Sequence, residues 1–174
     1  LSDGEEKPNA DIFPKLVNSG LCQRIRDEII KSLSTIKPSI AFYHMKETGL
    51  LSYVFPELDI MSGVDIIDNK GHKDVFIHTL QVVDNAAKLT DKMEVRFAAL
   101  VHDIAKPQTK KFIDGKGWTY YGHEIVGINL MKKLAKRMKL SNELRDYLCK
   151  LIKLHLRPIA LAKKGVTDSA VRRV

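Results

Sequence analysis

The middle of the chain contains an apolar run that leads into a histidine and an aspartate: Phe97-Ala98-Ala99-Leu100-Val101-His102-Asp103-Ile104. The wider segment Lys92–Ile104 is predicted to be a helix that is apolar on nearly all sides. A helix of this kind usually lies at the centre of a helical protein, covered by its neighbours. We therefore expect Lys92–Ile104 to be the buried central helix, with His102 and Asp103 close to its end.

Amphipathic helices are predicted on both sides of this segment, because apolar residues recur there at helical spacing. Before it, the expected helices span Leu21–Ile36, Ser39–Thr48 and Lys73–Leu89, with a short helical turn between Phe55 and Ser62. After it, the expected helices span His123–Met138 and Asn142–His155, the second stopped by Pro158. The sequence therefore predicts an all-α protein.

A β signal interrupts this helical pattern. Thr109–Phe112 and Trp118–Tyr121 flank a five-residue connection that contains two glycines, which is typical of a hairpin. Asp65–His72 is predicted to be a linker, with a turn at Asn69-Lys70-Gly71. The expected fold is thus all-α with one small β-hairpin.

The composition narrows the class of protein. Of the 174 residues, 44% are hydrophobic and 29% are charged, which is typical of a globular domain rather than a disordered chain. There is neither a secretory leader nor an apolar run near the roughly 20 residues that span a bilayer. Cys22 and Cys149 cannot form a disulfide framework. We expect a cytoplasmic protein without a membrane partner.

Positive charge is concentrated in the second part of the chain. Residues 1–103 contain 12 Lys and Arg against 16 Asp and Glu, whereas residues 104–174 contain 17 against 5. This asymmetry indicates a polyanionic partner, with nucleic acid as the first candidate. A solvated basic helix surface explains the same charge equally well, so composition alone leaves both interpretations open.

Six histidines occur, and four of them stand out by their positions: His78 within the helix Lys73–Leu89, His102 late in the central helix, His123 at a helix start and His155 at a helix end. Taken singly, each has a plain structural explanation, such as a core histidine bonded to a carbonyl or a cation at a helix C-terminus. Buried together with Asp103, however, they would need a neutralising cation. Imidazole and carboxylate are good ligands for divalent metals, so we predict a metal site assembled from several helices.

The motifs that contain these residues resemble a known family. His78-Thr79-Leu80, His102-Asp103-Ile104-Ala105-Lys106-Pro107, Gly122-His123-Glu124 and Leu154-His155 are similar to the motifs of HD-domain metal-dependent phosphohydrolases. More narrowly, the chain from about residue 20 onward resembles the C-terminal part of bacterial tRNA nucleotidyltransferases (CCA-adding enzymes) and poly(A) polymerases. The further segments that carry this resemblance are Arg24–Ile29, Lys37–Phe42, Gly49–Leu51, Phe55–Leu58, Lys73–Phe76, Gly117–Tyr120, Leu156–Pro158 and Val166–Arg173.

The resemblance implies a particular domain organisation. Residues 1–63 are expected to form a short helical neck that follows a nucleotidyltransferase head, and residues 64–174 an HD-domain helical bundle truncated at its C-terminal end. Nucleotide addition, with its ATP and CTP, is expected of the missing head and not of this chain. The family's last metal-ligating Asp is expected beyond Val174, and Ala105 occupies a position that is usually Gly.

The resemblance also implies a site and a reaction, the hydrolysis of a phosphate ester of RNA or a nucleotide, such as a 2′,3′-cyclic phosphate. His78, His102 and Asp103 would bind a first divalent ion (Mg, Mn, Ni or Fe), and Asp103 would bridge to a second ion at His123 and His155. Asp103 and Lys106 are the expected catalytic residues, Lys106 by pairing with phosphate oxygens. Alternatively, Lys106 is only a cation near a helix C-terminus.

RNA, with tRNA as the first candidate, is the expected partner. The predicted phosphate contacts are Lys132, Lys133, Lys136 and Arg137, joined by Lys139, and a C-terminal cluster of Lys163, Lys164, Arg172 and Arg173. Trp118, Tyr120 and Tyr121 would either stack on bases or pack inside the protein. A stand-alone HD nucleotide phosphohydrolase and a non-catalytic helical RNA-binding module remain as alternatives, and the sequence does not indicate an oligomeric state.

Overall fold

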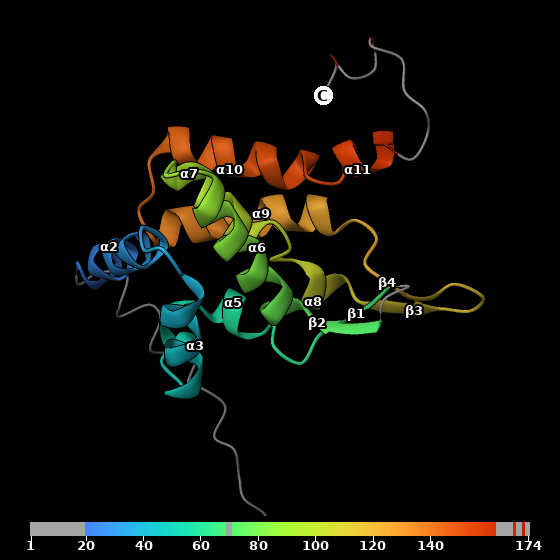
Figure 1. The fold of residues 1–174 in the computed structure, drawn as a ribbon, viewed down its shortest axis with the longest axis horizontal. Helices are drawn as coiled ribbons and strands as arrows, with labels where there is room; N and C mark the ends of the chain where they lie inside the picture. Colours follow the sequence, from blue (N-terminus) through green and yellow to red (C-terminus); the bar gives the residue numbers. More distant parts are fainter. Residues whose placement is uncertain (1–19, 69–70, 163–168, 170–171, 173–174) are drawn as a thin grey trace, which may run out of the picture.

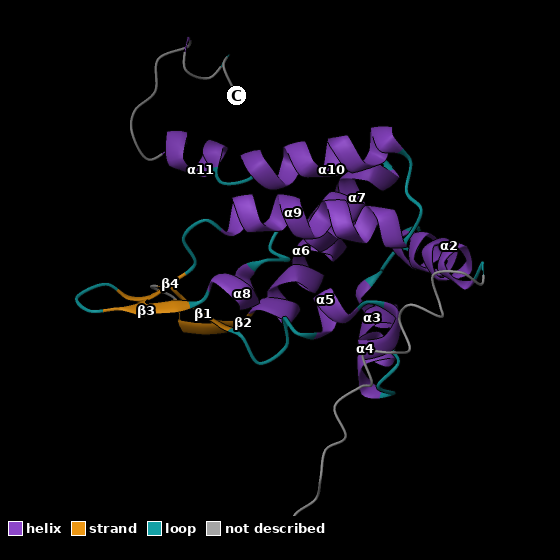
Figure 2. Ribbon diagram, turned by 180° about the vertical axis from the view of Figure 1, so that it is seen from behind, coloured by secondary structure: helices purple, strands orange, loops and turns teal. Residues whose placement is uncertain are grey.

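The computed structural model of the protein describes residues 20–68, 71–162, 169 and 172. Helices dominate this part of the chain, with short strands between them (Figures 1 and 2). In chain order the elements are α2 (Leu21–Leu33), α3 (Ser39–Glu47), α4 (Leu51–Val54), α5 (Pro56–Asp59), β1 (Asp65–Asp68), β2 (Gly71–Asp74), α6 (Val75–Leu89), α7 (Met93–Val101), α8 (Lys106–Thr109), β3 (Lys111–Ile113), β4 (Gly117–Thr119), α9 (His123–Arg137), α10 (Asn142–Leu154) and α11 (Arg157–Ala162).

Helix α7 lies at the centre, as its apolar sequence predicts. It contacts α6, α10 and α2, while α9 packs along α10. Phe97, Leu100 and Val101 are completely buried and belong to the main apolar cluster. The buried core of the molecule is therefore built around α7, and His102 and Asp103 follow directly after this helix.

The first helices share this core. Leu33 of α2, Phe42 of α3 and Phe55 between α4 and α5 lie in the same apolar cluster as the α6 and α7 side chains. In Figure 1 the helices α2 and α3 lie at one end of the molecule and the strands at the other. The expected all-α class is therefore confirmed, with the helices α2 to α5 packed directly onto the later helices.

Two hairpins are present in the described residues where the sequence predicted one. The expected hairpin is β3–β4, in which Phe112 pairs with Trp118. The segment 65–72, predicted to be a linker, instead contributes β1 and half of β2, with Asp65 opposite Asp74. The prediction missed these strands because only Ile66 and Ile67 in them favour a β conformation.

The predicted helices agree with the observed ones apart from shifts of a few residues at their ends. The main correction concerns Pro158, which was expected to stop the helix before it. Helix α10 already ends at Leu154, and Pro158 is the second residue of α11. Proline is compatible with a first helical turn because its missing N–H has no helical partner there.

Within the described residues, Cys22 and Cys149 are not joined by a disulfide. None of the described helices combines the length and the apolar character that crossing a bilayer requires.

Candidate metal centre

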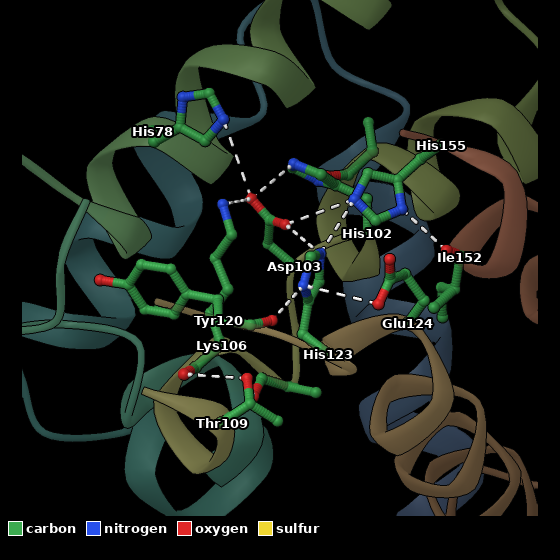
Figure 3. Close-up of polar contacts among 12 residues, drawn as sticks. His78, His102, Asp103, Lys106, Thr109, Tyr120, His123, Glu124, Ile152 and His155 are labelled. Carbon is green, nitrogen blue, oxygen red and sulfur yellow. Dashed lines mark hydrogen bonds and ion pairs between the residues drawn. The ribbon is translucent and has the colours of Figure 1, made fainter. Parts of the chain in front are cut away.

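Helix ends bring the four predicted histidines together (Figure 3). His102 and His155 are the residues that follow the last turns of α7 and α10, and His123 is the first residue of α9. His78 lies in the first turn of α6, which begins where the Asp74 side chain accepts a hydrogen bond from the Ile77 N–H. Together with Asp103 these residues are called here the His–Asp cluster.

Asp103 lies at the centre of this cluster, with only 2% of its side chain exposed. Its Oδ2 lies 3.0 Å from His102 Nε2 and 3.9 Å from His78 Nε2. Its Oδ1 lies 3.6 Å from His155 Nε2 and 3.7 Å from His123 Nε2. The cluster therefore consists of two three-residue groups that share one carboxylate, each compact enough to bind a cation.

Backbone carbonyls orient three of the four imidazoles. His102 Nδ1 lies 2.8 Å from the Ala99 carbonyl oxygen, and His123 Nδ1 lies 2.8 Å from that of Tyr120. His155 Nδ1 lies 2.7 Å from the carbonyl oxygen of Ile152. Because a carbonyl only accepts hydrogen bonds, each Nδ1 carries a proton, and in the neutral ring each Nε2 has a lone pair directed into the cluster.

The His–Asp cluster contains more hydrogen-bond acceptors than donors when its imidazoles are neutral. His123 Nε2 and His155 Nε2 lie 3.3 Å apart, and both are acceptors when neutral. Asp103 Oδ1 is buried and has no hydrogen-bond partner in the described part of the chain. Buried acceptors that face one another are unfavourable unless a cation lies between them. The donor set, imidazole nitrogen with one carboxylate, suits divalent transition metals, so these residues fit a metal ion.

The electrostatics of the cluster favour a cation, which can be a metal ion or a proton on His155. Burial opposes ionisation of Asp103, but the imidazoles of His102 and His155 and the Lys106 ammonium keep its pKa well below the usual range. Burial also disfavours the protonated form of His155, yet the Asp103 carboxylate outweighs it and raises the pKa of His155. Burial lowers the pKa of His78, which favours its neutral form. Neutral imidazole is the form that binds metal.

Lys106 is the nearest cation to Asp103. It begins α8, and its Nζ lies 2.7 Å from Asp103 Oδ2 with 14% of the side chain exposed. The same ammonium lies 5.6 Å from the centre of the Tyr120 ring. Lys106 therefore lies at the edge of the cluster, where its charge can reach either Asp103 or a bound anion.

A cleft of about 770 Å³ opens from the cluster between α6, α7 and α10. Its polar end contains His78, His102, Asp103, Lys106 and His155, whereas the remainder is apolar. The apolar lining includes Val82 and Ala86 of α6, Val95 and Ala99 of α7, and Leu151 and Leu154 of α10. These residues were not predicted from the sequence. Their only signal is a spacing of three or four between small or apolar residues, which also marks ordinary core positions.

The predicted phosphate contacts are only partly available. Lys132, Lys133 and Lys136 are exposed on α9, and Lys132 and Lys136 line a groove of about 640 Å³ with Lys139 and Arg145. Arg137 forms an ion pair with Glu57 of α5, 2.6 Å between Nη2 and Oε2, and so links α9 to the neck. Arg172 is exposed, and Lys163, Lys164 and Arg173 lie outside the described residues.

Family models match most of the chain in two consecutive segments. The model described as "HD domain" matches residues 75–172, which include every member of the His–Asp cluster. The model described as "Probable RNA and SrmB- binding site of polymerase A" matches residues 22–61, from α2 to just beyond α5. The hairpin β1–β2 lies between the two matched segments.

Curated relatives share sequence with most of the chain. A "Multifunctional CCA protein" of Psychromonas ingrahamii is 35% identical over 153 residues, which are 83% of this chain and 36% of the relative. Proteins of that name in Vibrio campbellii and Shewanella frigidimarina are 40% and 39% identical over 127 residues, 71% of this chain and 30% of each relative. The chain thus spans about a third of the length of these relatives.

Proposed function

Because the chain belongs to the HD domain family, we propose that its His–Asp cluster is a divalent-metal site that hydrolyses phosphate esters. The substrates would be RNA or nucleotide esters, with a 2′,3′-cyclic phosphate as the first candidate. The observation that carries this proposal is the shared Asp103, whose two oxygens face two separate pairs of imidazole Nε2 atoms. A carboxylate that can bridge two ions is a common arrangement in phosphoryl hydrolysis.

The chain's own residues have distinct roles in this proposal. His78 and His102 would bind one ion with Asp103 Oδ2, and His123 and His155 a second ion with Oδ1. A divalent ion bound there polarises the phosphate and lowers the pKa of water, which supplies the nucleophile near neutral pH. The carbonyls that accept from each Nδ1 keep the imidazoles oriented throughout.

Lys106 and the cleft would act on the substrate. The Lys106 ammonium, now paired with Asp103, lies close enough to the cluster to neutralise phosphate oxygens as negative charge develops. The apolar lining of the cleft excludes water and offers space for the organic part of an ester. We therefore assign Asp103 and Lys106 as the catalytic residues.

We further propose that this activity belongs to a tRNA-processing protein, a proposal supported by the similarity to relatives named "Multifunctional CCA protein" and by the match to an RNA-binding model. Residues 1–63 would form the neck and residues 64–174 the HD domain. CCA addition or polyadenylation, with ATP and CTP, would take place in a head domain outside these 174 residues. The exposed lysines of α9 and the groove beside Lys139 would bind the phosphates of RNA, and the protein would be cytoplasmic.

Hydrolysis of 2′,3′-cyclic AMP by the purified chain, with Mg²⁺, Mn²⁺, Ni²⁺ or Fe²⁺ supplied in turn, tests the proposal. We expect activity with at least one ion, and a loss of at least 100-fold in His102→Ala and Asp103→Ala. The matched control is His44→Ala, because His44 is an exposed histidine on α3 outside the cluster.

Two results would contradict the hydrolase proposal. Equal activity in Asp103→Ala and the parent would exclude the cluster as the site of reaction. Metal binding without hydrolysis of mononucleotide or RNA esters would favour the alternative, a non-catalytic RNA-binding module. Full activity on free nucleotides together with an absence of RNA binding would favour a stand-alone nucleotide phosphohydrolase.

A further inference from the structure

The hairpin β3–β4 exposes aromatic rings that a packed protein would bury. Phe112 is 59% exposed, Trp118 45% and Tyr121 68%, and all of β3 is exposed. In Figure 2 the hairpin extends away from the helices, and no described helix covers it. Exposed aromatic rings beside basic residues are typical of surfaces that bind single-stranded nucleic acid.

The strand register places two of these rings together. Phe112 and Trp118 are directly opposite each other in the ladder, and their ring centres lie 5.4 Å apart at 74°. Because side chains alternate across a strand, both rings are on one face of the hairpin, and Lys111 and Thr119 are on the other. The Phe112–Trp118 pair therefore forms an exposed aromatic surface on that face of the hairpin.

Lysines accompany the aromatic residues along the hairpin. Lys110 Nζ lies 4.8 Å from the centre of the Trp118 ring, and Lys116 Nζ lies 5.8 Å from that of Tyr121. Each ammonium is thus placed to meet a phosphate while the adjacent ring meets a base. An apolar protein partner would leave these ammonium groups without counter-charges. An RNA strand, in contrast, supplies phosphates for the lysines and bases for the rings.

The face of the hairpin that carries Phe112 and Trp118 continues toward the His–Asp cluster. Tyr120 follows Trp118 by two residues, a rise of about 6.6 Å along an extended chain. Its ring lies beside Lys106, whose Nζ contacts Asp103 Oδ2, and its carbonyl accepts from His123 Nδ1 (Figure 3). A strand that lies over Trp118 would therefore meet Tyr120 and Lys106 before it reaches the cluster.

We propose that the hairpin β3–β4 is a stacking platform for the single-stranded 3′ end of an RNA. One base stacks on the Phe112–Trp118 pair, Lys110 faces a backbone phosphate, and the terminal phosphate points past Tyr120 toward Lys106. The delivery of that phosphate for hydrolysis rests on the proposed function, whereas the stacking itself does not.

Trp118 provides its own probe, because it is the only tryptophan in the 174 residues. Its fluorescence is followed while the chain, in EDTA, is titrated with a single-stranded 12-nucleotide RNA that ends in a 3′-phosphate. EDTA prevents metal-dependent hydrolysis, so the outcome is independent of the proposed activity. We expect quenching by at least half with the single strand and little quenching with the same sequence as a blunt duplex.

Variants test the contribution of the rings with labelled RNA. We expect Trp118→Ala to raise the Kd at least tenfold and Phe112→Ala three- to fivefold, while Trp118→Phe stays within threefold. The matched control is Tyr147→Ala, which removes a ring that is 38% exposed from α10, outside the hairpin and outside residues 22–61, and leaves the Kd unchanged. A Trp118→Ala variant with the parent's Kd, or a parent that binds the RNA without quenching, overturns the proposal.

Discussion

Asp103 is buried and ionised, and one of its oxygens has no hydrogen-bond donor in the described part of the chain. Its charge is balanced by Lys106 on one side, while the other oxygen faces two imidazole nitrogens that are acceptors when neutral. A carboxylate of this kind stabilises the fold only through its cationic neighbours. Removing its charge therefore affects both stability and metal binding.

We predict that Asp103→Asn lowers the free energy of unfolding in EDTA by about 2 kcal/mol at pH 7, because the Lys106 ammonium loses its partner. The pKa of Asp103 is lower in the folded protein than in the unfolded chain. This contribution is therefore fully present above about pH 4 and declines as the pH falls further. Urea denaturation measures both effects.

The control for this variant is Asp146→Asn, which removes an exposed carboxylate paired with Arg145. Exposed ion pairs contribute little, so its effect should stay within about 0.5 kcal/mol. An Asp103→Asn variant as stable as the parent at pH 7 would contradict the role given to the pair with Lys106.

The members of the His–Asp cluster could be predicted, but its distances could not. The positions of His78, His102, His123 and His155 along the predicted helices selected them from six histidines, and the resemblance to a family implied that Asp103 is shared between the two pairs. The distances from Asp103 to the imidazoles depend on where four helix ends meet, which no local pattern encodes. The sequence also could not separate Arg137, which pairs with Glu57, from its exposed lysine neighbours on α9.

At the level of elements, α9 approaches α10 closely at Gly127. A Cβ built on Gly127 would lie 3.0 Å from Ile152 Cγ2 and 3.7 Å from the Ala105 Cβ. Glycine inside a helix lowers stability by about 1 kcal/mol relative to alanine. We therefore attribute the glycine at position 127 to the lack of space for a side chain. The Ala105 methyl lies at ordinary van der Waals distance from this position, so the close contact is the one with Ile152.

We therefore predict that Gly127→Val lowers the free energy of unfolding by about 2 kcal/mol, since the added methyl groups meet the buried Ile152 side chain. Asn129→Val introduces the same residue at an exposed position of α9 and should change stability by less than about 0.5 kcal/mol. Thermal unfolding compares the two. Equal midpoints for both variants would show that α9 is not closely packed at Gly127.

Periodicity predicted the helices well because their apolar faces pack on one core. It failed for β1 and β2, where a hairpin forms without the alternation of apolar and polar residues that marks a strand. It also misjudged Pro158, because a proline that cannot extend α10 is still compatible with the first turn of α11. Both errors concern segments whose structure depends on neighbouring elements rather than on their own residues.

At the scale of the whole molecule, one buried arginine joins the end of α2 to the central helices. Arg96 of α7 has hydrogen bonds at 2.7–3.1 Å to the carbonyls of Leu33, Thr35, Ala87 and Thr90 and to the carboxylate of Asp91. Leu33 and Thr35 lie at the C-terminal end of α2, and Ala87 lies in the last turns of α6. A single planar guanidinium thus satisfies carbonyls from both parts of the chain.

We predict that Arg96→Lys lowers the free energy of unfolding by about 3 kcal/mol, because one ammonium cannot reach all of these acceptors. Arg145→Lys, at a partly exposed arginine of α10, should change it by less than about 0.5 kcal/mol. Urea denaturation followed by circular dichroism measures both. A small effect of Arg96→Lys would mean that the neck is attached mainly by apolar contacts.

Titration of the EDTA-treated chain with Ni²⁺ in a calorimeter decides whether the His–Asp cluster is a metal site. We expect at least one ion to bind per chain, with affinity reduced more than 100-fold in Asp103→Asn and in His102→Ala and unchanged in His44→Ala. Binding of Ni²⁺ to Asp103→Asn with the affinity and stoichiometry of the parent would contradict a metal site at this cluster.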